Sequence, residues 1–144
     1  MISTITHFLL TELIWGLTGG IYHTPLSFLL LFILLKLWDH VRFVRALWLS
    51  LFFAAGAWII FMAGIAGIMW LFNVHYLLPE DTYHPFYSYL SASLSFAALI
   101  TLIQWVQLFI LKRFVRVRFW HVFVCILCAN VMSAVLVYKL TLAV

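Results

Sequence analysis

The sequence predicts an all-α integral membrane protein: a four-span transmembrane helical bundle, residues 1–144 forming a single domain, with an N-terminal interfacial or re-entrant helix. Three observations predict this class. Hydrophobic residues make up 67% of the chain and charged residues only 8%, whereas an ordinary soluble domain is about 25% charged. Apolar runs recur that are long enough to cross a hydrocarbon core of about 30 Å as helices, and too continuous for barrel strands. Basic residues gather between these runs.

The composition also excludes several classes of protein. A chain of 144 residues with a mean hydropathy of +1.18 has too much apolar surface for a soluble domain of its size to bury. We therefore exclude a soluble globular protein, a disordered chain and a nucleic-acid-binding module. The lipid bilayer is the expected surrounding.

Residues 2–17 form the weakest apolar segment, which predicts a helix lying in the membrane interface. Its polar residues recur at every fourth position and so share one helical face; they are Ser3, His7 and Thr11. Three glycines are expected to end this helix: Gly16, Gly19 and Gly20. The alternative is a fifth span over residues 5–22 with a turn at residues 23–25, although Glu12 and the glycines disfavour it.

Four spans follow along the chain. Span one is predicted at 24–40, where Thr24 would cap the helix, Pro25 would occupy its first turn and Lys36 would reach to the interface. The other three spans are cleaner apolar runs, predicted at 46–72, 86–111 and 119–141.

The basic residues predict the orientation. Seven of the eight fall between spans one and two or between spans three and four: Lys36, Arg42, Arg45, Lys112, Arg113, Arg116 and Arg118. The connection at 73–85 has none. By the positive-inside rule the basic loops are cytoplasmic, in what is expected to be the bacterial inner membrane. The N-terminus would then lie outside with four spans and inside with five.

Titratable residues gather on the expected outer face: His23, His75, Glu80, Asp81 and His84. Histidines with carboxylates can bind a divalent metal ion or respond to pH. Their spacing matches no established ligand motif, so we expect a solvated loop with helix-capping acids, no metal site and no cofactor.

Two other pairs invite a redox interpretation. Cys125 and Cys128 share a helical face inside span four, where small packing residues are expected rather than an activated thiolate. His40 and His121 lie at helix ends and could ligate a haem, but their bulky neighbours favour interfacial histidines.

Small residues mark two faces where helices are expected to pack. Span two contains Gly56, Ala63, Gly64 and Gly67, and span three contains Ser91 and Ser95. Small residues let helix backbones approach closely in lipid. The two faces could meet each other, or they could dock a second protein.

Four polar side chains lie deep in the apolar runs: Thr101, Gln104, Gln107 and Asn130. An unpaired amide in hydrocarbon costs several kcal/mol, so we expect Asn130 to bond another helix, most simply span three. The stripe that includes Thr101 and Gln104 would bond helices together, or it could line a permeation path.

No nucleotide-binding loop, catalytic constellation or metal motif is present in the sequence. The leading prediction is a non-catalytic subunit or assembly factor of a larger membrane complex, whose partners are other membrane subunits or further copies of the chain. The alternatives are a small oligomeric transporter or channel and a membrane-embedded redox protein.

Overall fold

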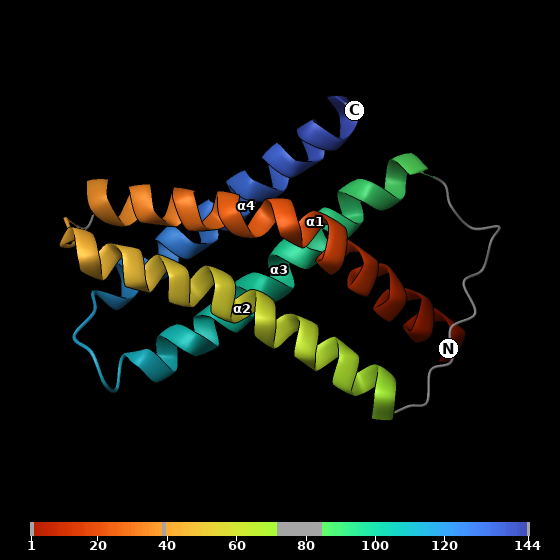
Figure 1. Cartoon of the computed structure of the whole chain (residues 1–144), viewed down its shortest axis with the longest axis horizontal. Coiled ribbons are helices and arrows are strands. Elements are labelled where there is room, and N and C mark those ends of the chain that lie inside the picture. Colours follow the sequence, from red (N-terminus) through yellow and green to blue (C-terminus); the bar gives the residue numbers. More distant parts are fainter. Residues whose placement is uncertain (1, 39, 72–84, 144) are drawn as a thin grey trace.

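The computed structural model describes residues 2–38, 40–71 and 85–143. Four helices account for nearly all of them: α1 (Ile2–Leu37), α2 (Phe43–Leu71), α3 (Pro85–Leu111) and α4 (Phe119–Ala143). Each contains a stretch that is long and apolar enough to cross a membrane. The predicted all-α membrane bundle is therefore confirmed (Figure 1).

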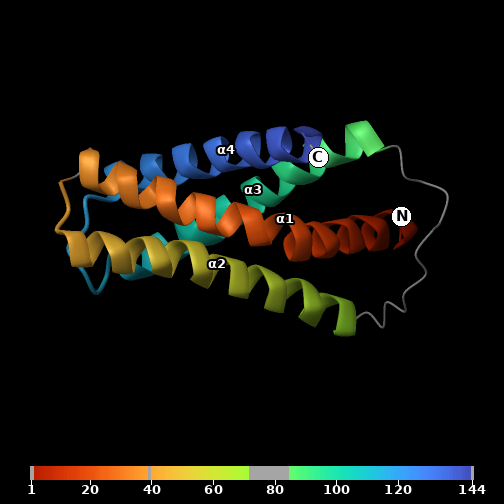
Figure 2. The same cartoon turned by 45° about the horizontal axis from the view of Figure 1, so that its top comes forward.

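The helices alternate in direction, so that the connections α1–α2 and α3–α4 lie at the same end of the bundle (Figures 1 and 2). We call this the basic end, because its two loops, residues 38–42 and 112–118, contain most of the positive charge. Among the described residues, α2 and α4 each pack against both α1 and α3. A central pair, α1 and α3, thus separates two outer helices.

The first helix corrects two predictions. Residues 2–17 do not form a separate interfacial helix and no turn interrupts residues 23–25, because α1 continues without a break from Ile2 to Leu37. The proposed cap at Thr24 and the proposed fifth span are therefore wrong. Glycine lowers helix stability by only about 1 kcal/mol, and here Gly16 and Gly20 lie against α2, where close packing offsets that cost.

Pro25 lies inside α1 rather than at its start. A proline within a helix has no N–H to donate to the carbonyl four residues earlier, and its ring pushes that carbonyl away. In Figures 1 and 2 the first half of α1 runs at an angle to the second half. The bend lets the N-terminal half follow α2 while the other half stays between α2 and α4.

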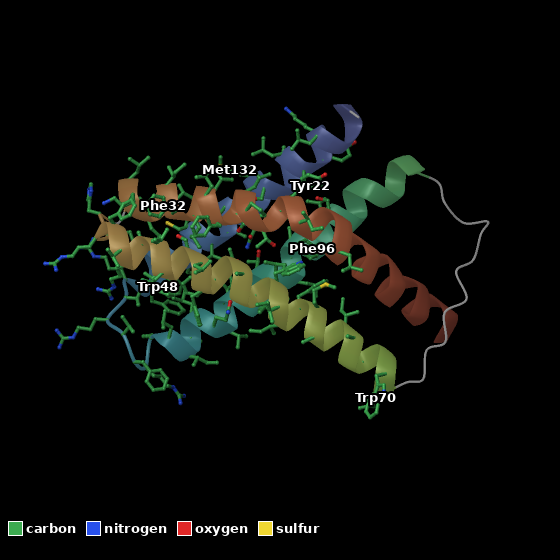
Figure 3. The ribbon with its side chains drawn as sticks, in the orientation of Figure 1. Tyr22, Phe32, Trp48, Trp70, Phe96 and Met132 are labelled. Atoms are coloured by element: carbon green, nitrogen blue, oxygen red, sulfur yellow. The ribbon has the colours of Figure 1, made fainter. Side chains whose placement is uncertain are left out.

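The apolar core has two parts. One lies toward the basic end and includes Leu31, Phe53 and Ile126, all fully buried. The other lies toward the opposite end and is centred on Phe61 and Phe96, whose rings meet edge to face at 4.9 Å. Phe96 is seen between the helices in Figure 3. The polar side chains of the candidate site lie between these two cores.

Candidate functional site

Asn130 is the centre of a hydrogen-bond network inside the bundle. Its side chain is fully buried on α4. The two Nδ2 protons are donated to α3, one to Thr101 Oγ1 at 2.9 Å and one to Gln104 Oε1 at 2.6 Å. Its Oδ1 accepts a hydrogen bond from Ser27 Oγ on α1, at 2.9 Å. The prediction that Asn130 bonds span three agrees with its two bonds to α3, and the side chain also bonds α1.

The network continues outward from Asn130 along α3. Thr101 Oγ1 donates to the carbonyl of Ala97 one turn earlier, at 2.7 Å. Gln104 Nε2 donates to the carbonyl of Phe53 on α2, at 2.8 Å. Side chains of α1, α3 and α4 and the backbone of α2 are therefore joined in one connected set of bonds.

Two further side chains of α3 bond neighbouring helices outside this network. Ser93 Oγ donates to the carbonyl of Ala134 at 3.2 Å, and Gln107 Nε2 donates to the carbonyl of Phe52 at 3.3 Å. The predicted stripe of α3 therefore faces its neighbours over most of its length. This arrangement supports the interpretation as interhelical bonding over that of a permeation path.

Some buried polar atoms have no hydrogen-bond partner within the described residues. They are His23 Nε2, Ser50 Oγ, Trp105 Nε1, Gln107 Oε1 and Ser133 Oγ. Four of these groups are uncharged side chains, for which a missing bond costs about 1–3 kcal/mol. His23 differs from them because it is ionisable.

His23 does not belong to an outer loop, which corrects its predicted position. It lies in α1, one turn before Ser27, and is only 2% exposed. Its ring meets the ring of Phe96 on α3 edge to face at 5.2 Å. The prediction assumed that the chain turns at Pro25, whereas the continuous helix carries His23 into the bundle. An ionisable residue therefore does lie within a span.

The rest of the predicted titratable cluster, His75, Glu80, Asp81 and His84, lies outside the described residues. Among the residues that the structure does describe, no three metal-ligating side chains come together. His23 itself is buried inside the bundle against Phe96.

The cysteine and histidine pairs have unlike surroundings. Cys125 is fully buried in the core near the basic end, and Cys128 is half-buried. His121 packs edge to face against Trp38, at 5.9 Å between ring centroids. His40 is exposed in the loop after α1 and has a positive φ of 48°.

The small-residue face of span two does not meet span three as one prediction had it. Ala63, Gly64 and Gly67 lie on the exposed side of α2, because its buried side is the stripe that includes Phe61 and Ile65. Ser95 of α3 is half-buried, and the side chain of Ser91 lies outside the description. Gly56 is the exception, since a Cβ there would lie 2.8 Å from Gln107 Nε2.

Gly16 and Gly20 were expected to end a helix, and they were not recognised from the sequence as a helix-packing pair on α1. A Cβ at Gly20 would lie 2.5 Å from Trp58 Nε1, and one at Gly16 would lie 2.8 Å from the ring of Phe61. Trp58 Nε1 also donates to the carbonyl of Gly16 at 2.9 Å. The spacing of four residues between the glycines was the available signal, since it is typical of close helix contacts in membranes.

The predicted basic residues lie at the basic end, on both of its loops and the adjoining helix ends. Lys36 Nζ donates to the carbonyl of Val41 at 3.2 Å, and Lys112 Nζ lies 5.0 Å from the centre of the Phe119 ring. Arg45 donates to the carbonyl of Arg116 and so joins the first turn of α2 to the loop between α3 and α4. Exposed tryptophans surround this end: Trp38, Trp48 and Trp120. Such belts are typical of a membrane interface.

The comparisons with known proteins add no relationship to this description. No family model, no curated protein and no solved structure matches the chain. What the fold supports directly is a polytopic membrane protein built from four apolar helices around a buried polar network.

Proposed function

We propose that this protein is a non-catalytic subunit or assembly factor of a larger complex in the bacterial inner membrane, and that the exposed small-residue face of α2 docks a helix of another subunit. We call this surface the α2 glycine face and define it as Ala63, Gly64, Ala66 and Gly67. All four residues are exposed.

The observation that carries the proposal is the open space over this face. Apart from the neighbouring backbone of α2 itself, a Cβ built at Gly64 or Gly67 would meet no atom of the described residues within 4 Å. Lipid tails gain nothing specific from glycine, whereas a second helix can approach its backbone closely and gain van der Waals contact. Two glycines and two alanines close together on an exposed helix face therefore favour protein over lipid as the neighbour.

The polar network supports a scaffold rather than a catalyst. Asn130, Thr101 and Gln104 bond one another and the neighbouring helices. Groups held in this way stabilise the bundle. A binding site for a substrate would instead offer polar groups to a cavity.

Purification of the native protein in a mild detergent tests the proposal. We expect other subunits to co-purify in fixed stoichiometry with the wild type and to be lost from the double variant Gly64→Leu with Gly67→Leu. The leucines would fill the space that a partner backbone needs. Ala98→Leu is the matched control, because Ala98 is an exposed small residue on α3.

Three outcomes would contradict the proposal. The first is a wild-type protein that purifies alone as a monomer. The second is equal loss of the other subunits from the Ala98→Leu control. The third is a pure homo-oligomer, which would support a transporter or channel instead.

The orientation is part of the proposal, with the basic end in the cytoplasm. Its support is the concentration of basic residues in the two loops at that end. In a background without Cys125 and Cys128, single cysteines in place of Phe43 and Val115 should react only with reagents that reach the cytoplasm. Labelling of either position from the periplasm would reverse the orientation.

An oligomeric transporter is the second candidate, and His23 is the observation that favours it. Ionisable residues inside spans often mark proton or ion pathways, and Nε2 of this histidine has no partner within the described residues. Proton flux into liposomes that contain the purified protein, lost in His23→Phe but kept in Ser95→Ala, would favour this candidate. A visible absorption band in the purified protein would point to the redox alternative.

A further inference from the structure

The basic end contains a pocket of about 470 Å³ between its two loops. Five of its lining residues are basic or titratable: His40, Arg42, Arg45, Arg116 and Arg118. The others are Val41, Leu49 and Val117. No acidic residue is among the lining residues, and Asp39 lies outside the described part of the chain. Small-molecule sites in proteins have volumes of about 300–1,000 Å³, so the pocket is large enough for a phosphate group with its substituents.

Two helices begin beside this pocket. The carbonyl of Arg42 accepts the first bond of α2, from Ala46 N, and the carbonyl of Arg118 accepts from Val122 N at the start of α4. Both arginines therefore occupy N-cap positions. Serine, threonine, aspartate or asparagine is usual there, because a side-chain oxygen can accept from the free N–H groups of the first turn. Arginine has no such acceptor.

The two helix starts and the arginines at their N-caps have the same electrostatic preference. Free N–H groups and the helix dipole give each helix start a partial positive charge, which favours an anion. An arginine at the N-cap adds positive charge where an acid would be favourable. An anion bound between the two helix starts would offset the positive charge of both the helix ends and the arginines.

The arginines of the pocket differ from the nearby lysines. Lys36 and Lys112 are engaged with a backbone carbonyl and with a phenyl ring, and neither lines the pocket. Any basic residue would satisfy the positive-inside rule. Membrane orientation alone therefore does not explain why the permanently charged residues that line the pocket are all arginines and none is a lysine. The planar guanidinium can donate two parallel hydrogen bonds to a phosphate, which an ammonium cannot do.

The position of the pocket indicates where the anion would come from. Trp38, Trp48 and Trp120 are exposed around the same end, as is typical of the boundary between hydrocarbon and headgroups. Lipid phosphates lie at this level of a bilayer. Figure 3 shows long side chains with terminal nitrogens extending from this end of the bundle.

We propose that this pocket binds a phosphate group, which in the membrane is the headgroup phosphate of an anionic phospholipid. Arg42 and Arg116 would donate to its oxygens beside the starts of α2 and α4. Arg45 helps to fix the shape of the pocket, because its bond to the carbonyl of Arg116 holds the first turn of α2 against the loop between α3 and α4. This inference does not depend on the docking of another subunit.

The test measures lipid binding to the full-length protein in a mild, uncharged detergent by native mass spectrometry and thermal unfolding. The probes are phosphatidylglycerol, phosphatidylcholine and sodium phosphate, with sodium chloride at the same ionic strength as a reference. Phosphatidylglycerol should bind and raise the unfolding temperature more than phosphatidylcholine, whose choline compensates the phosphate charge. If sodium phosphate displaces phosphatidylglycerol, the site accepts free phosphate as well; if it does not, the lipid is the sole source among these probes.

The double variant Arg42→Gln with Arg116→Gln should bind phosphatidylglycerol about a hundredfold more weakly or worse, since a hydrogen bond to a charged group contributes about 1.5–3 kcal/mol and 1.4 kcal/mol is a factor of ten. Lys112→Gln with Arg113→Gln removes the same charge from the same end but outside the pocket lining. This control should retain most of the binding. The unfolding temperature of each variant without lipid shows whether it is folded.

The proposal is overturned if the control loses as much binding as the pocket variant, because the attraction would then be that of net charge alone. It is also overturned if the folded protein binds phosphatidylglycerol and phosphatidylcholine equally well. Arg42→Lys with Arg116→Lys keeps the charge, and it should recover only part of the binding if the paired donors of arginine matter.

Discussion

Two pairs of glycines in this bundle have opposite surroundings. Gly16 and Gly20 on α1 are covered by α2, so that a Cβ at either would lie within 3.0 Å of Trp58, Phe61 or Met62. Gly64 and Gly67 on α2 have no described atom beyond the neighbouring backbone of α2 within 4 Å of the same position. Both pairs lie on apolar helices, but among the described residues only the first pair is covered by another helix.

The difference separates two uses of the same residue. At Gly16 and Gly20 the missing side chains admit an indole ring and expose a backbone carbonyl that accepts from it. At Gly64 and Gly67 the missing side chains leave space that no side chain of the described residues fills. Glycine in a helix interior costs about 1 kcal/mol relative to alanine, so an open pair lowers helix stability without an internal gain. A partner outside the chain would supply that gain.

The largest expected difference is between two single variants, one with leucine at Gly20 of the covered pair and one with leucine at Gly64 of the open pair. Gly20→Leu should destabilise the protein by about 1–3 kcal/mol or more, the usual cost of overpacking, because the ring of Trp58 is held by its bond to Gly16. Gly64→Leu should leave the stability of the purified chain nearly unchanged. Thermal unfolding in detergent compares them, and similar losses in both variants would remove the contrast between the two pairs.

Asn130→Leu tests the stability of the bundle separately from its binding to other subunits. The change leaves Ser27, Thr101 and Gln104 without their central partner, and we expect a loss of about 1 kcal/mol, within the range measured for interhelical bonds in membranes. Recovery of co-purifying subunits should remain close to wild type, since Asn130 is fully buried and far from the α2 glycine face. Unchanged or increased stability would contradict the role of Asn130 as the centre of the network.

Trp58→Phe should have the smallest effect. It keeps an aromatic ring over Gly16 and Gly20 but removes the N–H that bonds the Gly16 carbonyl. A single hydrogen bond is worth about 0.5–1.5 kcal/mol net, so a small decrease in unfolding temperature is expected. The variant Trp58→Ala, which also removes the ring, should lose clearly more; equal losses would show that packing contributes nothing at this contact.

The spans were predictable because hydrophobicity is a local property that can be read residue by residue. The predicted spans 46–72, 86–111 and 119–141 each overlap one of the apolar stretches long enough to cross a membrane, Phe43–Ile68, Ser93–Leu111 and Phe119–Leu140. The course of α1 was not predictable by the same means. Glycine and proline have unfavourable local propensities, and only the contact with Trp58 and Phe61 shows why a helix continues through Gly16 and Gly20.

The polar residues show a similar limit. The cost of an unpaired amide in hydrocarbon predicts that Asn130 and Gln104 have partners, but it does not identify them. Ser27 gave no signal of its own, because serine is common in membrane helices, and its role follows only from the distance to Asn130. The position of His23 was predicted wrongly because the local propensities of glycine and proline suggested a turn at residues 23–25, where α1 in fact continues.

The position of Asn130 near the middle of the last helix has a consequence for how the chain matures during synthesis. The helices leave the ribosome in the order α1 to α4, so Ser27, Thr101 and Gln104 enter the translocon before the amide that joins them exists. Until then Thr101 and the Nε2 of Gln104 can already bond the carbonyls of Ala97 and Phe53, but Ser27 Oγ and Gln104 Oε1 lack the partner that Asn130 supplies. Insertion of α4 would therefore be the step that joins α1 to α3 through side-chain hydrogen bonds, and arrest of synthesis before this helix should leave the first three helices less tightly associated.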